Sequence, residues 1–500
     1  MRILSYLLSS APPVRAPNIV SSIAFSGKGR YNTVNFVSWK QGGTVRVCMN
    51  IIIAGDGKVG STLTRQLSAE GHDITVIDSN NQVLAESVER YDVFSVEGNC
   101  ASMSVLAQAR VKDADLLIAA TSKDEVNLLC CTTAHAMNPK LHTIARIRNP
   151  EYTEQIYNMR DVFGLSMVIN PENQAATEIE RLLKYPGFLR RDTFAKGSTE
   201  IVELRVEPGS KLCNVKLADL RSIVKCQVLV CAVLRDGTAS APGGDFILRE
   251  GDRLFVTALS ENLTTLLKNL GLLTRRTRSV FLCGGGRVSY YLANKLSRAG
   301  IQVKIIENDP ARCREISARL PGVEVIYGDA SNQELLESEG LGSCDALVTL
   351  TGLDELNMIV SLYAISRRVP QVITKLGHND NRSIIDSLNL GSLVCPKELC
   401  STTIVRYVRA MQNQTGAALS VHAIADGQAE AMEFLVDDRT RFRNTPLKQI
   451  KLKPNVLVVS IAHGAKTEIA NGESFFRTGD TVVVVTNGRT GLRQLGDIFA

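Results

Sequence analysis

The stretch Asn50-Ile-Ile-Ile-Ala-Gly55-Asp-Gly57-Lys-Val-Gly60 decides the fold of this chain. An apolar run ends at the first glycine, and apolar residues recur at helical spacing after the third. The pattern predicts a strand, a glycine turn and a helix, which is the context that a dinucleotide-binding fingerprint requires. Gly55 would permit the bend, Gly57 would let backbone N–H groups approach a pyrophosphate, and Gly60 would let the helix lie close to its strand. A glycine turn in an ordinary α/β unit is the alternative interpretation.

A second apolar run, Ile74-Thr-Val-Ile-Asp78, ends on an acidic residue 18 positions after Gly60. A carboxylate at this place accepts hydrogen bonds from an adenosine ribose and repels a 2′-phosphate. The pattern therefore favours NAD over NADP.

The whole pattern returns 229 residues later as Val280-Phe-Leu-Cys-Gly284-Gly-Gly286-Arg-Val-Ser289. The later correspondences are Asp78 with Glu307, Asn99 with Asp329, Thr121 with Thr351, Arg146 with Lys375, and Arg249-Glu-Gly-Asp252 with Arg477-Thr-Gly-Asp480. Repetition over this length indicates two copies of a whole two-part unit. In the second copy Ser289 replaces the third glycine and a lysine point charge replaces the arginine fork, which leaves equal occupancy of the two sites open.

The pattern of expected helices and strands in each copy predicts its domains. Helical segments alternate with strands in the first part of each copy, and short alternating strands with turns make up the rest. We therefore expect an α/β fold with two Rossmann-like, doubly wound parallel-sheet domains, each followed by a small β-rich α/β domain. The predicted bounds are 1–48 for a basic extension outside the fold, 49–190 and 279–412 for the nucleotide-binding domains, and 191–273 and 413–500 for the small domains.

Polar residues follow the predicted strands, and parallel strands present their carboxyl ends at one edge of a sheet. At that edge Asn99 would meet an adenine, Thr121 would lie by the pyrophosphate or second ribose, and Arg146 would pair with phosphate. A surface ion pair for Arg146 and a helix cap for Thr121 are the alternatives.

The formal charge of +6 comes largely from residues 1–48, which hold six basic residues and no acidic one. The remainder is nearly neutral, so nothing indicates a nucleic-acid surface. A start codon placed upstream, a transit-like peptide and a disordered basic arm all remain interpretations of this extension. Twelve cysteines without C-x-x-C pairs indicate reduced thiols, and no apolar stretch approaches the length of a membrane span.

No catalytic machinery is visible beside the predicted crevices. The pair Tyr291-x-x-x-Lys295 imitates that of short-chain dehydrogenases, but it stands on the helix opened by the glycine loop. None of the six histidines recurs at equivalent places in both copies, and their spacing suits no metal. We expect a ligand-binding sensor and not an enzyme; an NAD-dependent oxidoreductase with two fused Rossmann domains is the alternative.

The duplicated architecture and motifs resemble the tandem regulator-of-K⁺-conductance (RCK/KTN) proteins of bacterial Trk-type potassium uptake, over residues 49–500. The resemblance implies a cytoplasmic homotetrameric ring, peripheral on the inner face of the membrane and docked to an integral potassium-translocating subunit. It also implies binding of NAD(H), with ATP or ADP as further candidates. The cofactor-binding residues expected are Gly55, Asp56, Gly57, Lys58, Val59, Gly60, Asp78, Asn99, Thr121 and Arg146, with Gly284, Gly285, Gly286, Arg287, Val288, Glu307, Asp329, Thr351 and Lys375 in the second copy.

Overall fold

The computed structural model describes residues 48–184, 188–194, 197–272, 277–377, 385, 388, 390–411, 418–487, 492 and 494–500. The predicted extension therefore lies outside the described residues except for Cys48. Val47–Ala500 cluster as one unit.

The first half opens with a six-stranded sheet of order β3-β2-β1-β4-β5-β6, all of whose pairings are parallel. The central strands β1 and β4 are buried almost throughout, as near-continuous apolar runs are when helices cover both faces. The strands are β1 (Asn50–Ala54), β2 (Asp73–Asp78), β3 (Phe94–Glu97), β4 (Leu116–Ala119), β5 (His142–Arg146) and β6 (Met167–Ile169). The helices are α1 (Lys58–Ala69), α2 (Asn81–Arg90), α3 (Met103–Gln108), α4 (Asp124–Met137), α5 (Pro150–Met159) and α6 (Pro171–Lys184).

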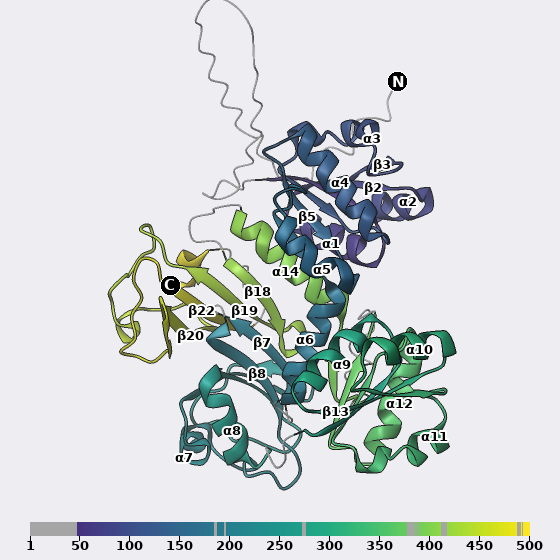
Figure 1. Ribbon diagram of the computed structural model, residues 1–500. Coiled ribbons are helices and arrows are strands. Elements are labelled where there is room, and N and C mark those ends of the chain that lie inside the picture. Colours follow the sequence, from purple (N-terminus) through teal and green to yellow (C-terminus); the bar gives the residue numbers. More distant parts are fainter. Residues whose placement is uncertain are drawn as a thin grey trace, which may run out of the picture. The chain divides into compact units, whose positions relative to one another are not determined.

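The second half contains a repeat of this sheet, which is green in Figure 1, and its strand order is β14-β13-β12-β15-β16-β17. Its strands are β12 (Ser279–Cys283), β13 (Gln302–Glu307), β14 (Glu324–Tyr327), β15 (Ala346–Thr349), β16 (Gln371–Lys375) and β17 (Ser392–Val394). Its helices are α9 (Arg287–Arg298), α10 (Pro310–Arg319), α11 (Gln333–Ser338), α12 (Asp354–Ser366) and α14 (Pro396–Met411). The predicted duplication of a doubly wound parallel sheet is confirmed.

Each parallel sheet is followed by a five-stranded antiparallel sheet, in the orders β10-β9-β11-β8-β7 and β18-β19-β22-β20-β21. The first comprises β7 (Phe188–Phe194), β8 (Thr199–Arg205), β9 (Val228–Arg235), β10 (Thr238–Ser240) and β11 (Arg253–Leu259), with helices α7 (Leu220–Val224) and α8 (Leu263–Leu270). The second comprises β18 (Ala418–Ile424), β19 (Ala429–Leu435), β20 (Val456–His463), β21 (Lys466–Ile469) and β22 (Thr481–Asn487). Apolar side chains of both sheets share one core cluster, which includes Phe194, Phe255, Val459 and Val483.

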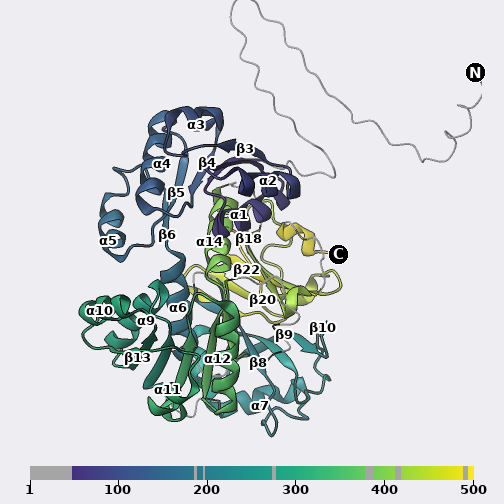
Figure 2. The same ribbon diagram turned by 90° about the vertical axis from the view of Figure 1, so that its right-hand side faces the viewer.

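The two halves exchange a helix. Helix α6 follows the last strand of the first parallel sheet, yet its Ala175, Ile179 and Leu183 lie in the core cluster of the second sheet, beside α9. Helix α14 follows the second parallel sheet, and its Ile404 and Val408 lie in the cluster of the first sheet, beside α1 (Figure 2). Each nucleotide-binding fold is thus completed by a helix from the other half. The domain bounds predicted from the sequence did not include this exchange of helices. The bounds themselves remain a prediction.

Among the described helices, none combines the length and the apolar character that crossing a membrane requires.

Candidate functional site

The first glycine loop joins β1 to α1 as predicted. Gly55 has φ +95°, and a Cβ added there would lie 2.7 Å from the backbone nitrogen of Thr121. A Cβ at Gly60 would lie 1.9 Å from the carbonyl oxygen of Gly55, so the helix approaches the turn as closely as its backbone allows. A Cβ added at Gly57 would meet no atom of the described residues within 4 Å, apart from its own chain neighbours, so the tip of the loop has room for a ligand.

The second loop has a similar backbone turn, but a different residue stands at the position of its third glycine. Gly284 has φ +102° and lies against Thr351, as Gly55 lies against Thr121. The fully buried Ser289 stands where the first copy has its third glycine, and its hydroxyl donates to the carbonyl oxygen of Gly284. The side chain therefore fits inside the turn and engages its backbone.

Both loops end at an uncapped helix. Gly57 and Gly286 are the N-caps of α1 and α9, no side chain caps either helix, and neither has an acidic residue in its first turn. Lys58 and Arg287 follow and are exposed. First-turn N–H groups that lack a capping side chain suit an anion, and the helix dipole favours negative charge there. Val59 and Val288 are buried in the core, so any ligand contact they make comes from the backbone.

The acidic residues at the ends of β2 and β13 bind the glycine loops. Asp78 accepts hydrogen bonds from the backbone N–H groups of Asp56, at 2.7 Å, and Asn80, at 2.9 Å. Glu307 accepts from those of Gly285, at 2.5 Å, and Asp309, at 2.9 Å. Both carboxylates are half-exposed. They hold the loop in place, and their partial exposure leaves them accessible to a ligand.

Behind the first loop lies a buried polar pair that the sequence patterns did not suggest. The carboxylate of Asp56, 2% exposed, accepts a 2.5 Å hydrogen bond from the hydroxyl of Ser87 on α2, and its Oδ1 has no hydrogen-bond partner within the described part of the chain. Burial raises the pKa of Asp56 to about 6, against the hydrogen bond from Ser87 and with help from the charge of Asp78. The second copy has Gly285 and Ile316 at these places, and a Cβ on Gly285 would lie 2.5 Å from Ile316 Cδ1.

One buried asparagine connects the loops at the edge of each parallel sheet. The fully buried Asn127 accepts from the backbone N–H of Thr121, at 2.8 Å, and from its hydroxyl, at 2.7 Å, and it donates to the carbonyl of Arg146 at 2.8 Å. Asn357 makes the same bonds to Thr351 and Lys375. The recurrence of T-x-x-D-E-x-N in both copies was the signal for these residues. The hydroxyls of both threonines are thus engaged within the loop.

The basic residues of the two crevices are half-buried, and neither forms an ion pair with a residue that the structure describes. The guanidinium of Arg146 donates to the carbonyl of Thr121 at 2.5 Å, its Nε is buried without a partner, and among the described residues no carboxylate pairs with it. Burial and the nearby Arg148 lower the pKa of Arg146. Lys375 donates to the carbonyl of Thr351 at 2.5 Å, and burial lowers its pKa too. The alternative of a surface ion pair for Arg146 does not fit this geometry.

One carboxylate acts on both of these cations. Glu172, near the start of α6, raises the pKa of Arg146 and of Lys375 against the larger effect of burial, and its Oε2 is buried without a hydrogen-bond partner. The charge of Lys58, from the first glycine loop, also acts on Lys375. The polar edges of the two crevices are therefore electrostatically connected.

Asn99 and Asp329 lie exposed at the ends of β3 and β14, where each accepts a backbone hydrogen bond two residues ahead, from Ala101 at 3.0 Å and Ser331 at 2.8 Å. Their contact with a ligand stays a prediction, as do the ligand contacts of the other residues expected from the sequence.

Tyr291 and Lys295, the pair that resembles the one in short-chain dehydrogenases, make contacts with the first half of the chain. The hydroxyl of Tyr291 donates to the carbonyl of Arg148 at 2.9 Å and accepts from the amide of Asn170 at 2.9 Å. Lys295 lies 3.9 Å from Glu180 on the exchanged helix α6. These contacts tie the second half to the first.

Comparison with known proteins agrees with this architecture. The TrkA-N domain model matches residues 51–171 and again 280–396, and the TrkA-C domain model matches residues 201–271. The Trk system potassium uptake protein TrkA of Halomonas elongata is 29% identical over 90% of this chain and 98% of its own length. A TrkA homologue of Archaeoglobus fulgidus is 30% identical over 87% of this chain and 97% of its own.

Solved structures share the fold at lower identity. The crystal structure of the GsuK RCK domain superposes with a TM-score of 0.57 at 17% identity, over 88% of this chain and 93% of that one. The GsuK channel bound to NAD gives 0.55 at 18% identity, over 88% and 77%. With two glycine-loop crevices, two antiparallel sheets and full-length relatives at this identity, the chain belongs to the TrkA family of Trk-system potassium uptake proteins.

Proposed function

We propose that this chain is the nucleotide-sensing regulatory subunit of a Trk-type potassium uptake system. It binds NAD(H) in its two crevices, with ATP or ADP as competing ligands, and it gates an integral potassium-translocating subunit. It works at the cytoplasmic face of the membrane, as a homotetrameric ring. The observation that carries the ligand is Arg146: a half-buried guanidinium without an ion pair among the described residues, beside a glycine loop and an uncapped helix.

The exchange of α6 and α14 supports a sensor. A ligand regulates only if its affinity differs between two conformations, and couplings of about 1–3 kcal/mol are typical. Because each exchanged helix lies in the core of the opposite fold, closure of one crevice acts on the other half through α6 or α14. The charge of Glu172 acts on both basic residues and adds a second link.

The test is thermal unfolding of the full chain titrated with NADH, NADPH, ATP and ADP. A ligand at 100 times its dissociation constant should add about 2.7 kcal/mol to the stability of a fold that alone binds it. We expect Asp78→Asn and Glu307→Asn each to reduce the NADH effect, and NADPH to stabilise little. The matched control is Asp115→Asn, since Asp115 also accepts a backbone N–H, from Asn50 at 2.9 Å, but at the opposite end of β1.

Absence of stabilisation by every nucleotide would refute the ligand assignment. Turnover of NADH with carbonyl substrates would refute the sensor and favour an oxidoreductase. Potassium uptake by cells that depend on this chain and its membrane partner then tests the gating step, with the same variants.

A further inference from the structure

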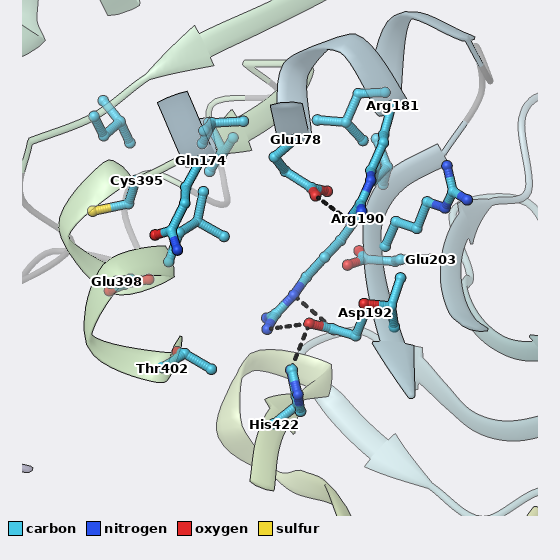
Figure 3. Close-up of a pocket in the computed structure, with 18 of the residues that line it drawn as sticks. Gln174, Glu178, Arg181, Arg190, Asp192, Glu203, Cys395, Glu398, Thr402 and His422 are labelled. Carbon is cyan, nitrogen blue, oxygen red and sulfur yellow. Dashed lines mark hydrogen bonds and ion pairs between the residues drawn. The ribbon is translucent and has the colours of Figure 1, made fainter. Parts of the chain in front are cut away.

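A cavity of about 510 Å³ lies between the exchanged helices α6 and α14 and the strand β7 (Figure 3). We call it the arginine cavity. No residue of either glycine loop lines it, and neither do Arg146 and Lys375. Six arginines line it, against four carboxylates: Arg181, Arg190, Arg191, Arg205, Arg253 and Arg406, with Glu178, Asp192, Glu203 and Glu398.

The duplication places equivalent residues on both sides of this cavity. Arg181 is the tenth residue after the proline that opens α6, and Arg406 is the tenth after the proline that opens α14. Both line the cavity. Asp192 and His422 likewise occupy the fifth position of β7 and of β18. Arg181 and Arg406 are thus an equivalent pair with one member from each copy, and the other four arginines that line the cavity all come from the first copy.

These two arginines are less neutralised than their neighbours. Arg190 lies 3.0 Å from Asp192, and Arg253 lies 2.5 Å from Glu203. The carboxylate paired with Arg181 is that of Glu178, at 3.7 Å, and burial raises the pKa of Glu178 to about 7. Burial therefore disfavours the ionised form of Glu178, so this carboxyl is a weak counter-ion for Arg181, whose side chain is 47% exposed.

Arg406 is oriented but not neutralised. Its Nη2 lies 3.1 Å from Nε2 of His422, and Nδ1 of His422 lies 2.9 Å from Oδ1 of Asp192. Burial opposes the ionisation of Asp192, but Arg190 and His422 outweigh burial and keep its pKa well below the usual range. Because an arginine can only donate, Nε2 of His422 accepts from Arg406 and Nδ1 of His422 donates to Asp192. The Nε of Arg406 is buried without a partner, and no carboxylate of the described residues pairs with it.

We propose that the arginine cavity binds a phosphate-bearing small molecule, with Arg181 and Arg406 as its two phosphate-binding forks. A phosphate carries nearly two negative charges and enough acceptor oxygens for two guanidinium forks, whereas a carboxylate satisfies one. The volume is that of a small-molecule site, and Leu376, Leu390 and Leu393 supply an apolar wall for the rest of the ligand. Such a ligand joins α6 to α14 at a place separate from both nucleotide crevices.

Titration calorimetry of the full chain with inorganic phosphate tests the proposal. We expect the double variant Arg181→Gln, Arg406→Gln to lose at least about tenfold in phosphate affinity, which is 1.4 kcal/mol. The matched control is Arg409→Gln, which removes the same charge from α14 but at a residue that pairs with Glu70. Unchanged affinity in the double variant, or no binding by the unmodified chain, would overturn the proposal.

Arginine modification by phenylglyoxal gives a second readout that requires no variant. Phosphate should slow the modification of Arg181 and Arg406 several-fold, as measured by mass spectrometry of peptides, and should leave Arg160 and Arg409 unaffected. Acetate at the same ionic strength should protect less. Equal modification with and without phosphate would overturn the site, and equal protection by acetate would overturn the assignment to phosphate. NADH binding that persists in the double variant keeps this result separate from the nucleotide crevices.

Discussion

The two glycine loops have nearly the same backbone and different chemistry behind it. The first holds a buried carboxyl, Asp56, against Ser87, where the second has Gly285 against Ile316. The third position of the glycine pattern in the first loop is Gly60, whose backbone lies close to the carbonyl oxygen of Gly55. The same position of the second loop is Ser289, whose hydroxyl donates a hydrogen bond to the carbonyl oxygen of Gly284. Both are held by an acidic residue at the end of the next strand. The turn therefore depends on its backbone hydrogen bonds, while side chains around it are free to diverge and give each crevice its own response.

The largest effect is expected from exchanging the third loop residue. Gly60→Ser should lower the free energy of unfolding by about 3 kcal/mol, because its Cβ would lie 1.9 Å from the Gly55 carbonyl oxygen. The reverse change, Ser289→Gly, removes one hydrogen bond and should cost about 1 kcal/mol. Urea unfolding of both variants measures the difference. Equal losses would show that the two turns tolerate a side chain alike.

The basic residues of the crevices come next. Arg146→Gln should weaken NADH binding to the first crevice by about 2 kcal/mol, because a charged hydrogen-bond donor to phosphate is lost. Lys375→Gln should cost the second crevice about 1 kcal/mol, since lysine offers a point charge and not a fork. Calorimetry with NADH measures both, and Arg65→Gln on the exposed face of α1 is the control. A larger loss from the lysine variant would reverse the expected ranking of the sites.

The buried carboxyl gives the first loop a pH dependence that the second lacks. The folded pKa of Asp56 is raised to about 6 from 3.8, so the folded state holds this proton over a pH range in which the unfolded state has lost it. The stability of the unmodified chain should therefore fall as pH rises from about 4 to 6. Asp56→Asn removes this term. The shift from 3.8 to about 6 makes the unmodified chain about 2 kcal/mol less stable at pH 8 than at pH 4. Because the amide also buries an N–H group, at a cost of about 2 kcal/mol at either pH, we expect the variant to gain about 1 kcal/mol above pH 7 and to lose about 1 kcal/mol near pH 4.

Urea unfolding at several pH values measures the gain, with Asp161→Asn, whose carboxylate is 92% exposed, as control. A gain that is the same at pH 4 and pH 8 would exclude Asp56 as the source.

The smallest effect is expected from the residue shared by both crevices. Glu172→Gln removes a negative charge that acts on Arg146 and Lys375, so both crevices should bind NADH two- to fivefold more tightly, or by less than about 1 kcal/mol. Calorimetry at low and high salt measures the change, which should shrink with salt. Tightening confined to one crevice would place the carboxylate in that crevice alone.

The sequence was sufficient to predict the glycine turns, the acidic residues that follow and the duplication of both sheets, since each leaves a local pattern. It did not predict the helix exchange. The apolar face of α6 indicates that the helix is buried, but it does not indicate which of the two sheets the helix packs on. The pair of Asp56 and Ser87 lies 31 positions apart and has no counterpart in the second copy, so neither spacing nor repetition points to it. Asn127 and Asn357 did repeat, but a motif alone does not distinguish a ligand contact from a loop support.

The crossing of α6 and α14 also bears on how the chain is made. Helix α6 emerges from the ribosome about 100 residues before the sheet on which it packs. The first sheet is complete at β6, but helix α14, which packs on it, is made more than 220 residues later. During synthesis the apolar face of α6 is without its partner sheet until the second glycine loop and its strands have followed. A gene cut between the repeats would separate each parallel sheet from one of the helices that pack on it, so the two pieces would have to reassemble to restore both cores.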